Sequence, residues 1–141
     1  MFAAIEAVFE AHSAVAGAGF VAVDFYDGSV MYDFAAREIH LVDLDGYRPP
    51  YTLHRERQFG SSRFMAPEEW QRGATIDERA TVYTLGRAAF VFLGGERGDP
   101  SLGCWRADAR LHAVARRATA TLRADRFATV AEMQRSWLAS S

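Results

Sequence analysis

The sequence predicts an α+β, mainly α fold, with one small β-hairpin and four to six helices. Two observations predict the helices: apolar residues recur at helical spacing, and Ser/Thr-x-x-Glu sequences typical of helix N-termini occur twice. A third observation, two short strand-like stretches on either side of a turn, predicts the hairpin. The chain has 141 residues, half of them apolar, which is ordinary for one domain. We therefore expect residues 1–141 to form a single domain.

The expected elements, in chain order, are a helix over 2–16, an extended run over 19–23, strands over 30–34 and 39–42, an irregular stretch over 45–65, a helix over 75–93, a loop over 96–104, a helix over 106–122 and a final helix that opens at 129.

The first helix and the hairpin follow from the N-terminal third of the sequence. Ile5, Phe9 and His12 lie on one helical face of an Ala-rich stretch, and Gly17 is placed to end that helix. Residues 35–38 supply the turn between the two strands. The stretch that follows contains Pro and Gly breakers, and a stretch of this length without periodicity is often functional.

Capping patterns and apolar stripes predict the later helices. Thr75 and Glu78 form a Ser/Thr-x-x-Glu capping box, and the apolar stripe behind it, centred on Leu85, predicts a central and largely buried helix. Thr129 and Glu132 form a second capping box, which opens the final helix.

Composition narrows the setting and the partners. The formal net charge of −2 disfavours a nucleic-acid or membrane surface built on bulk charge. No apolar stretch approaches the roughly 20 residues of a membrane span. Cys104 is the only cysteine, so no intrachain disulfide can form, and the cytoplasm is the expected compartment. All 16 Lys and Arg residues are arginines, so the chain contains no lysine.

Four segments carry the candidate chemistry, and they are residues 23–31, 39–45, 60–68 and 80–86. The third ends in Ala66-Pro67-Glu68, and the fourth contains Val82-Tyr83-Thr84-Leu85-Gly86. Together they resemble the end of the activation segment and the start of the central helix of protein kinases, which read G-T-x-x-Y-M-A-P-E and then D-V-Y-S-L-G. The resemblance extends over nearly the whole chain. It implies the C-terminal lobe of a serine/threonine protein-kinase-like fold, in which the small hairpin carries the catalytic and metal loops.

The same resemblance implies roles for residues in the first two segments. Asp24 takes the place of the catalytic aspartate in the loop H-R-D-x-x-x-x-N, and an Ala-Val pair replaces its His and Arg. Ser29 takes the place of the metal-binding Asn of that loop. Asp43 corresponds to the Mg²⁺-binding aspartate of Asp-Phe-Gly, and Asp45 is a further candidate metal ligand. This Asp-x-Asp sequence is also similar to that of the aminoglycoside phosphotransferases.

A structural ion pair is also implied. Arg126 matches the late arginine that pairs with the Ala-Pro-Glu glutamate in kinases, which is Glu68 here. The pair would tie the activation segment to the helical core and would have no catalytic role. The alternative is that both side chains are solvated surface charges.

The residue types support phosphoryl transfer on their own. That reaction needs one carboxylate near the acceptor hydroxyl and others that hold Mg²⁺, a hard cation that prefers oxygen ligands. The two candidate loops contain Asp24, Asp27, Asp43 and Asp45. Closely placed carboxylates repel one another, and a divalent cation relieves that repulsion. The alternative is that Asp27-Gly28 is an ordinary turn and Asp24 an ordinary loop residue.

Departures from the kinase pattern limit what carries over. The sequence opens with the helix before the catalytic loop, so an N-terminal lobe with its glycine-rich loop has no counterpart. The lysine that holds the α- and β-phosphates has none either. Thr81 stands where kinases keep an aspartate that braces the catalytic loop through its backbone N–H groups, and Ser29 is a poorer metal ligand than Asn. We expect Mg²⁺ and ATP as cofactors of the complete fold, with weak or no ATP binding by this chain alone.

Three functions remain open. The first is a protein-kinase-like phosphotransferase domain, represented by its C-lobe, that transfers the γ-phosphate of ATP to a protein Ser/Thr hydroxyl. The second is a catalytically inactive, pseudokinase-type interaction module, and the third is a small-molecule phosphotransferase related to the aminoglycoside kinases. The expected partners are a protein substrate, the missing N-lobe or a partner protein, and a second copy bound through the surface that an N-lobe would cover. No nucleic-acid or membrane partner is expected.

Overall fold

The computed structural model describes residues 2–95 and 98–141. These residues contain four α-helices and two small two-stranded antiparallel sheets. The fold is therefore α+β and mainly α, as the sequence predicts. The helices are α1 (Phe2–Gly17), α2 (Glu78–Leu93), α3 (Ala109–Ala118) and α4 (Val130–Leu138). The strands are β1 (Val30–Asp33), β2 (Glu38–Leu41), β3 (Tyr51–Thr52) and β4 (Thr75–Ile76). Residues 96–97 of the loop expected over 96–104 lie outside the described residues.

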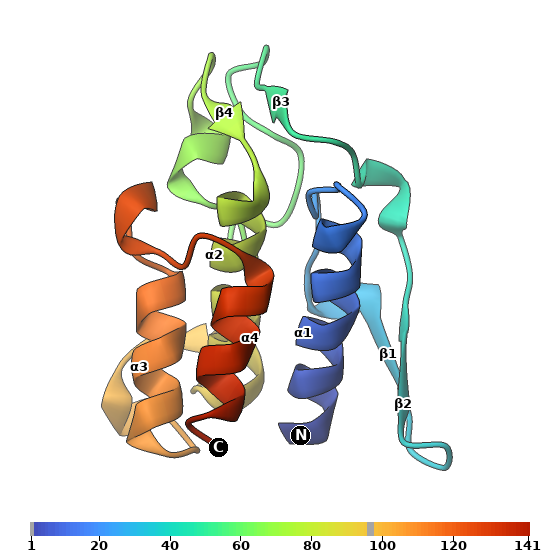
Figure 1. The fold of residues 1–141 in the computed structure, drawn as a ribbon, viewed down its shortest axis with the longest axis vertical. Coiled ribbons are helices and arrows are strands. Elements are labelled where there is room, and N and C mark those ends of the chain that lie inside the picture. Colours follow the sequence, from blue (N-terminus) through green and yellow to red (C-terminus); the bar gives the residue numbers. More distant parts are fainter. Residues whose placement is uncertain (1, 96–97) are drawn as a thin grey trace.

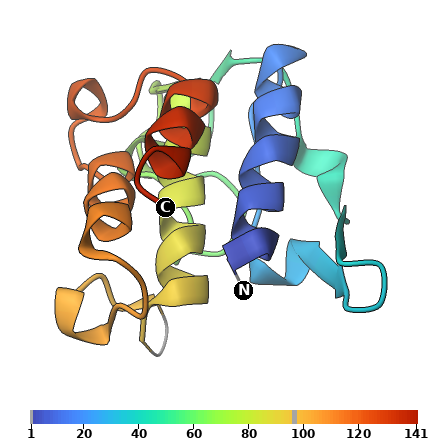
Figure 2. The ribbon, with the colours of Figure 1, turned by 60° about the horizontal axis from the view of Figure 1, so that its bottom comes forward.

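The four helices lie roughly side by side, and the β1–β2 hairpin lies along α1 on the side away from α3 and α4 (Figures 1 and 2). The β3–β4 pair lies at the end of the molecule where α2 begins, and the C-terminus lies at the opposite end, beside the start of α1 (Figure 1). Among the described residues, no helix has both the length and the apolar character needed to cross a membrane.

The central helix α2 forms the middle of the core, as its apolar stripe predicts. It packs against α1, α3 and α4, and its residues Val82, Leu85 and Phe90 are fully buried. Gly86 lets α3 approach closely, because a Cβ at this position would lie 2.8 Å from the Cβ of Ala118. The predicted position of this helix at the centre of the fold is confirmed.

The start of α2 differs from the prediction. Asp77 caps the helix, since its carboxylate accepts a hydrogen bond from the backbone N–H of Arg79 (3.0 Å). Thr75 belongs instead to β4, where it pairs with Thr52 of β3. The capping box predicted from Thr75 and Glu78 is therefore wrong. An Asp two residues further on is among the strongest N-cap residues, and strand pairing keeps Thr75 extended.

The third helix is shorter than the predicted range 106–122. The Asp108 carboxylate accepts a hydrogen bond from the backbone N–H of Arg110 (2.7 Å) and so fixes the start of α3. At the other end the Thr119 hydroxyl donates to the carbonyl of Ala115 (3.0 Å). Local caps therefore end a helix that its Ala- and Arg-rich composition would allow to continue.

The predicted hairpin is present. β1 and β2 pair antiparallel, with Val30 opposite Leu41. The carboxylate of Asp33 accepts hydrogen bonds from the backbone N–H groups of Ala35 (2.8 Å) and Ala36 (2.9 Å), which closes the turn. Each strand ends one residue earlier than predicted.

Part of the stretch predicted to be irregular is tied down by long-range pairing. β3 pairs with β4, and Val21 forms an isolated antiparallel bridge with Arg48. The backbone N–H of Leu53 donates to the carbonyl of Ala74 (2.9 Å). These partners lie far apart in the sequence, so no local pattern reveals them.

Candidate functional site

A buried segment presents Asp24 to solvent. Its neighbours Val23 and Phe25 are each only 2% exposed, whereas Asp24 is exposed. The backbone of Asp24 is left-handed, with a φ of 62°, which is uncommon outside glycine although Asp tolerates it better than most residues. Phe25 meets the rings of His12 and Phe64 edge-on, at 4.6 and 6.3 Å between ring centres. The loop that carries Asp24 is thus anchored by aromatic packing.

Asp43 opens the second loop shortly after β2. It is exposed, its φ is 58°, and a short 3₁₀ turn over Leu44–Gly46 that contains the exposed Asp45 follows it. Among the described non-glycine residues, only Arg37 in the hairpin turn shares this positive φ with Asp24 and Asp43. Left-handed non-glycine residues cluster at functional sites. Two of the three coincide with the predicted catalytic and metal-binding aspartates.

Two contacts hold the loops side by side. The backbone N–H of Val42 donates to the carbonyl of Ser29 (2.9 Å). Gly46 packs against Val23, because a Cβ at residue 46 would lie 2.9 Å from the Val23 carbonyl oxygen. A side chain at this position would push the loops apart. The predicted site residues Asp24, Ser29, Asp43 and Asp45 therefore lie on two adjoining loops.

Ser29 lies inside the first loop. It is 1% exposed, and its hydroxyl oxygen accepts a hydrogen bond from the backbone N–H of Tyr26 (3.4 Å). Its own backbone N–H donates to the Tyr26 carbonyl (2.9 Å). In this conformation Asp43 and Asp45 are the accessible oxygen donors of the predicted metal set.

The central helix reaches the first loop through Thr81. This side chain is fully buried, and its hydroxyl oxygen accepts a hydrogen bond from the backbone N–H of Ala22 (3.0 Å), two residues before Asp24. Thr81 thus makes one contact of the kind expected from the aspartate that it replaces. Because a hydroxyl is uncharged, this bond is weaker than a charge-assisted one.

The segment around Gly60 also approaches the first loop. Gly60 has a φ of +143°, and a Cβ there would lie 3.2 Å from a carboxylate oxygen of Asp24. Glycine therefore leaves room for that carboxylate. Arg63 forms an ion pair with Asp27 (3.1 Å) at the surface, which contributes little stability but joins the two segments.

His12 supports both loops from α1, which the sequence did not reveal. Its Nδ1 lies 2.8 Å from the carbonyl of Val8, and its Nε2 lies 2.7 Å from the hydroxyl of Tyr47, directly after the second loop. Burial lowers the pKa of His12 to about 4, so the ring is neutral near pH 7. Nδ1–H then donates to Val8, and the Tyr47 hydroxyl donates to Nε2. Burial also raises the pKa of Tyr47 well above its usual value.

Glu68 and Arg126 form the expected ion pair, and it is buried. Nη1 and Nη2 of Arg126 lie 2.7 and 2.9 Å from the two carboxylate oxygens of Glu68. The arginine side chain is fully buried. Its other hydrogen bonds go to the carbonyls of Ala120, Arg79 and Thr121. Every N–H of the guanidinium is thereby used, which is the condition under which a buried charge is tolerated.

Glu69 is a second buried carboxyl beside this pair. One of its oxygens accepts a hydrogen bond from the backbone N–H of Ala66 (2.7 Å). Burial, with a smaller contribution from the charge of Glu68, raises the pKa of Glu69 to about 7.

The described residues contain no group of three or more His, Cys, Asp or Glu side chains placed to hold a metal ion. Magnesium commonly uses only one or two carboxylates, and water and substrate phosphates supply its remaining ligands. Asp43 and Asp45 are the exposed carboxylates of the second loop. The Mg²⁺ site remains a prediction.

No protein-family model and no curated protein match this sequence. The likeness to protein kinases therefore rests on segments 60–68 and 80–86 and on the loop geometry described above.

Proposed function

We propose that this chain is the C-terminal lobe of a protein-kinase-like phosphotransferase, which transfers the γ-phosphate of ATP to a protein Ser/Thr hydroxyl. The observation that carries the proposal is the junction of the two acidic loops. The hydrogen bond from Val42 to Ser29 and the close packing of Gly46 on Val23 hold the loops together. The proposal needs this junction because it places one carboxylate near the acceptor hydroxyl and others on a Mg²⁺ ion at the same reaction centre.

The scaffold around the junction supports the same proposal. The hydrogen bond from Ala22 to Thr81 ties the first loop to the central helix. The ion pair of Glu68 with Arg126 ties the Ala-Pro-Glu segment to the helices after it. In kinases the corresponding segments are held together in the same order, so these long-range contacts agree with the resemblance.

Each acidic residue has a separate role in this proposal. Asp24 would orient the acceptor hydroxyl and accept its proton. Asp43 and Asp45 would hold a Mg²⁺ ion, which supplies positive charge to the phosphate oxygens when it is bound. The buried Ser29 would keep the first loop in shape through its contacts with Tyr26.

A metal titration followed by amide NMR tests the site. Mn²⁺ takes the same hard oxygen ligands as Mg²⁺ and broadens nearby resonances. We expect the first broadening at residues 23–29 and 42–46, and Asp43→Asn should abolish it. Asp125→Asn, which removes an exposed carboxylate outside both loops, is the matched control. Broadening that is equal in wild type and Asp43→Asn would overturn the proposed site.

Nucleotide binding gives a second test. A kinase cleft holds ATP between two lobes, and this sequence has no lysine to contact the α- and β-phosphates. Calorimetry of the chain with Mg·ATP should therefore show weak or no binding. Micromolar affinity would contradict this part of the proposal.

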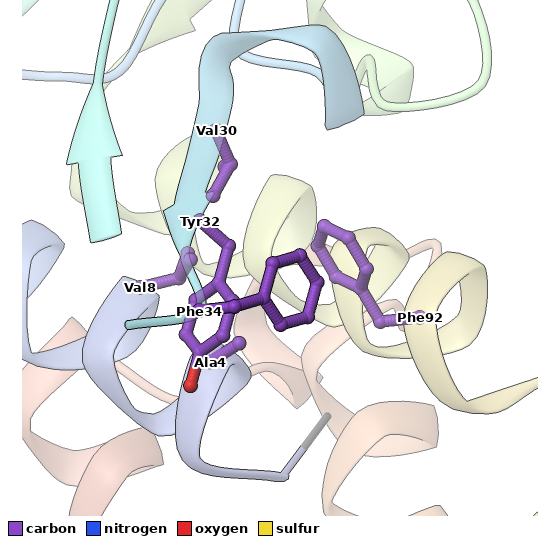
Figure 3. A pocket seen from close by; sticks show the side chains of 6 residues that line it. All are labelled: Ala4, Val8, Val30, Tyr32, Phe34 and Phe92. Atoms are coloured by element: carbon purple, nitrogen blue, oxygen red, sulfur yellow. The ribbon is translucent and has the colours of Figure 1, made fainter. Parts of the chain in front are cut away.

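An interaction module of the pseudokinase type is the second candidate, and exposed apolar side chains favour it. Phe34 is 85% exposed, Met31 60% and Leu44 40%. Beside Phe34 opens a cavity of about 170 Å³, lined by Ala4, Val8, Val30, Tyr32, Phe34 and Phe92 from α1, the hairpin and α2 (Figure 3). Such a surface predicts self-association. Sedimentation that shows only monomer at high protein concentration would count against this candidate.

A further inference from the structure

Residues 48–63 form a basic surface on a chain whose net charge is −2. The arginines of this segment are Arg48, Arg55, Arg57 and Arg63. Glu56 is its only carboxylate, and it pairs with Arg72 from outside the segment (3.6 Å). Neither Arg48 nor Arg55 has an ion-pair partner in the described part of the chain. Within the part of the chain that the structure describes, no carboxylate therefore neutralises either charge through an ion pair.

Three of these guanidinium groups are held against aromatic rings. Arg48 lies over Tyr51 at 4.0 Å, Arg55 over Phe59 at 4.6 Å, and Arg57 over Trp70 at 4.4 Å, measured to the ring centres. Stacking restricts the guanidinium plane while leaving its N–H edge free to donate. An arginine held in this way loses less conformational entropy when it binds an anion.

Arg48 and Arg55 line the same pocket, which has a volume of about 220 Å³. Thr52, His54 and Gln58 add hydrogen-bonding groups to its wall. The hydroxyl of Tyr51 donates to the Gln58 side-chain carbonyl (3.0 Å) and fixes the orientation of that amide. The wall therefore combines two guanidinium groups with further hydrogen-bonding side chains.

The backbone beneath this pocket is anchored, so the pocket does not have to be assembled on binding. Arg48 exchanges two backbone hydrogen bonds with Val21, at 2.8 and 3.3 Å. The backbone N–H of Gln58 donates to the carbonyl of Glu69 (2.7 Å). The segment between these bonds contains β3, which pairs with β4.

We propose that this pocket binds a phosphate monoester on a peptide of a partner protein. Two arginines suit a phosphate better than a carboxylate, because a phosphate offers three acceptor oxygens and about two negative charges. Recognition of phosphorylated motifs by arginine clusters is an established mode of peptide binding. Nucleic acid is disfavoured by the net charge of the chain and because a guanidinium group covers one face of each nearby ring.

The pocket is distinct from the proposed phosphotransfer site, since none of Asp24, Ser29, Asp43 and Asp45 lines it. The binding proposal therefore stands or falls independently of that function.

Amide NMR titration of the full chain tests the proposal with a short alanine-based peptide that contains one phosphoserine. We expect saturable shifts centred on residues 48–58, and no such shifts with the unphosphorylated peptide. Arg48→Gln and Arg55→Gln should each weaken binding by about tenfold or more, because each removes a charge-assisted contact. Arg116→Gln removes an equal charge from an exposed position on α3 and should leave the affinity unchanged.

Three results would overturn the proposal. They are the absence of saturable shifts with the wild-type chain, an equal loss of affinity in Arg116→Gln, and binding to phosphatidic acid vesicles or inorganic phosphate that matches or exceeds binding to the phosphopeptide. The wild-type shift map needs no variant, so it stays decisive if a pocket variant fails to fold. Circular dichroism of each variant identifies that case.

Discussion

Two buried titratable groups, His12 and Glu69, should give this protein opposite pH dependences of stability. Burial lowers the pKa of His12 from 6.5 to about 4, so between these pH values the unfolded chain binds a proton that the folded chain does not. The stability that depends on neutral His12 is therefore complete above pH 6.5 and is lost as the pH falls toward 4.

Glu69 behaves in the opposite sense. Burial raises its pKa from 4.5 to about 7, so between these values the folded chain holds a proton that the unfolded chain has released. The stability that depends on protonated Glu69 is complete below pH 4.5 and is lost as the pH rises toward 7.

The two effects should nearly cancel in the wild type. A pKa change of one pH unit corresponds to about 1.4 kcal/mol, so each group accounts for about 3 kcal/mol of unfolding free energy. His12 is 0% exposed and Glu69 is 3% exposed, so solvent does not screen either effect appreciably. Between pH 4.5 and 6.5, where both groups change protonation, their combined contribution to the unfolding free energy should therefore change little with pH.

Substitution of each residue should separate the two opposite pH dependences of the unfolding free energy. For Glu69→Gln, which keeps an acceptor for the Ala66 N–H, the unfolding free energy relative to wild type should rise by about 3 kcal/mol between pH 4.5 and 7. For His12→Gln it should fall by about 3 kcal/mol between pH 4 and 6.5. Urea unfolding followed by circular dichroism measures both. A uniform loss of stability does not matter, because the readout is the change with pH.

The control is Gln71→Ala, which truncates an exposed side chain that carries no titratable group. The difference in unfolding free energy between this variant and wild type should stay constant between pH 4 and 7. If the difference in unfolding free energy between Glu69→Gln and wild type instead stays constant with pH, the pKa of Glu69 is not raised by burial and the reasoning is wrong.

Three further substitutions test the framework of the site. Arg126→Met should lower the unfolding free energy by about 3–5 kcal/mol, because it leaves the buried Glu68 carboxylate with only its longer contact to Arg123 (3.8 Å). Urea titration measures this, and Arg116→Met should stay within about 0.5 kcal/mol of wild type. Gly86→Ala should cost about 1–3 kcal/mol through overpacking against α3, visible as a lower Tm, and an unchanged Tm would refute the close approach of the helices. Thr81→Val should cost about 1–3 kcal/mol by leaving the Ala22 N–H unpaired, while Thr81→Ser should restore hydrogen-exchange protection at that amide.

The elements that could be predicted from sequence are those whose signals are local. The apolar stripe of α2 and the cap of α4 each depend on neighbouring residues. Thr129 does accept a hydrogen bond from the Glu132 N–H (3.1 Å), although the Glu132 carboxylate accepts in return from Ala128 N–H, one residue earlier than the capping box requires. At the start of α4 a tertiary contact reinforces the local pattern, since the Val130 N–H donates to the Glu78 carboxylate (2.8 Å).

What the sequence could not reveal depends on contacts between distant residues. The β3–β4 pairing and the role of His12 beneath both loops each join segments that are adjacent only after folding. The start of α2 was misplaced for the same reason, since Thr75 is held by a strand partner that the sequence around it does not show. For the site, the order of the motifs predicted which residues lie on adjoining loops, but it did not predict that Ser29 is buried.

The hydrogen bonds of Arg126 have a consequence for the order in which the chain matures. Its partner Glu68 is synthesised 58 residues earlier and must stay hydrated until Arg126 has left the ribosome. The same guanidinium also needs the carbonyls of Arg79, Ala120 and Thr121. The Ala-Pro-Glu segment can therefore dock only when residues 120–126 are available, so a nascent chain that stops before Arg126 should remain sensitive to proteases around residue 68.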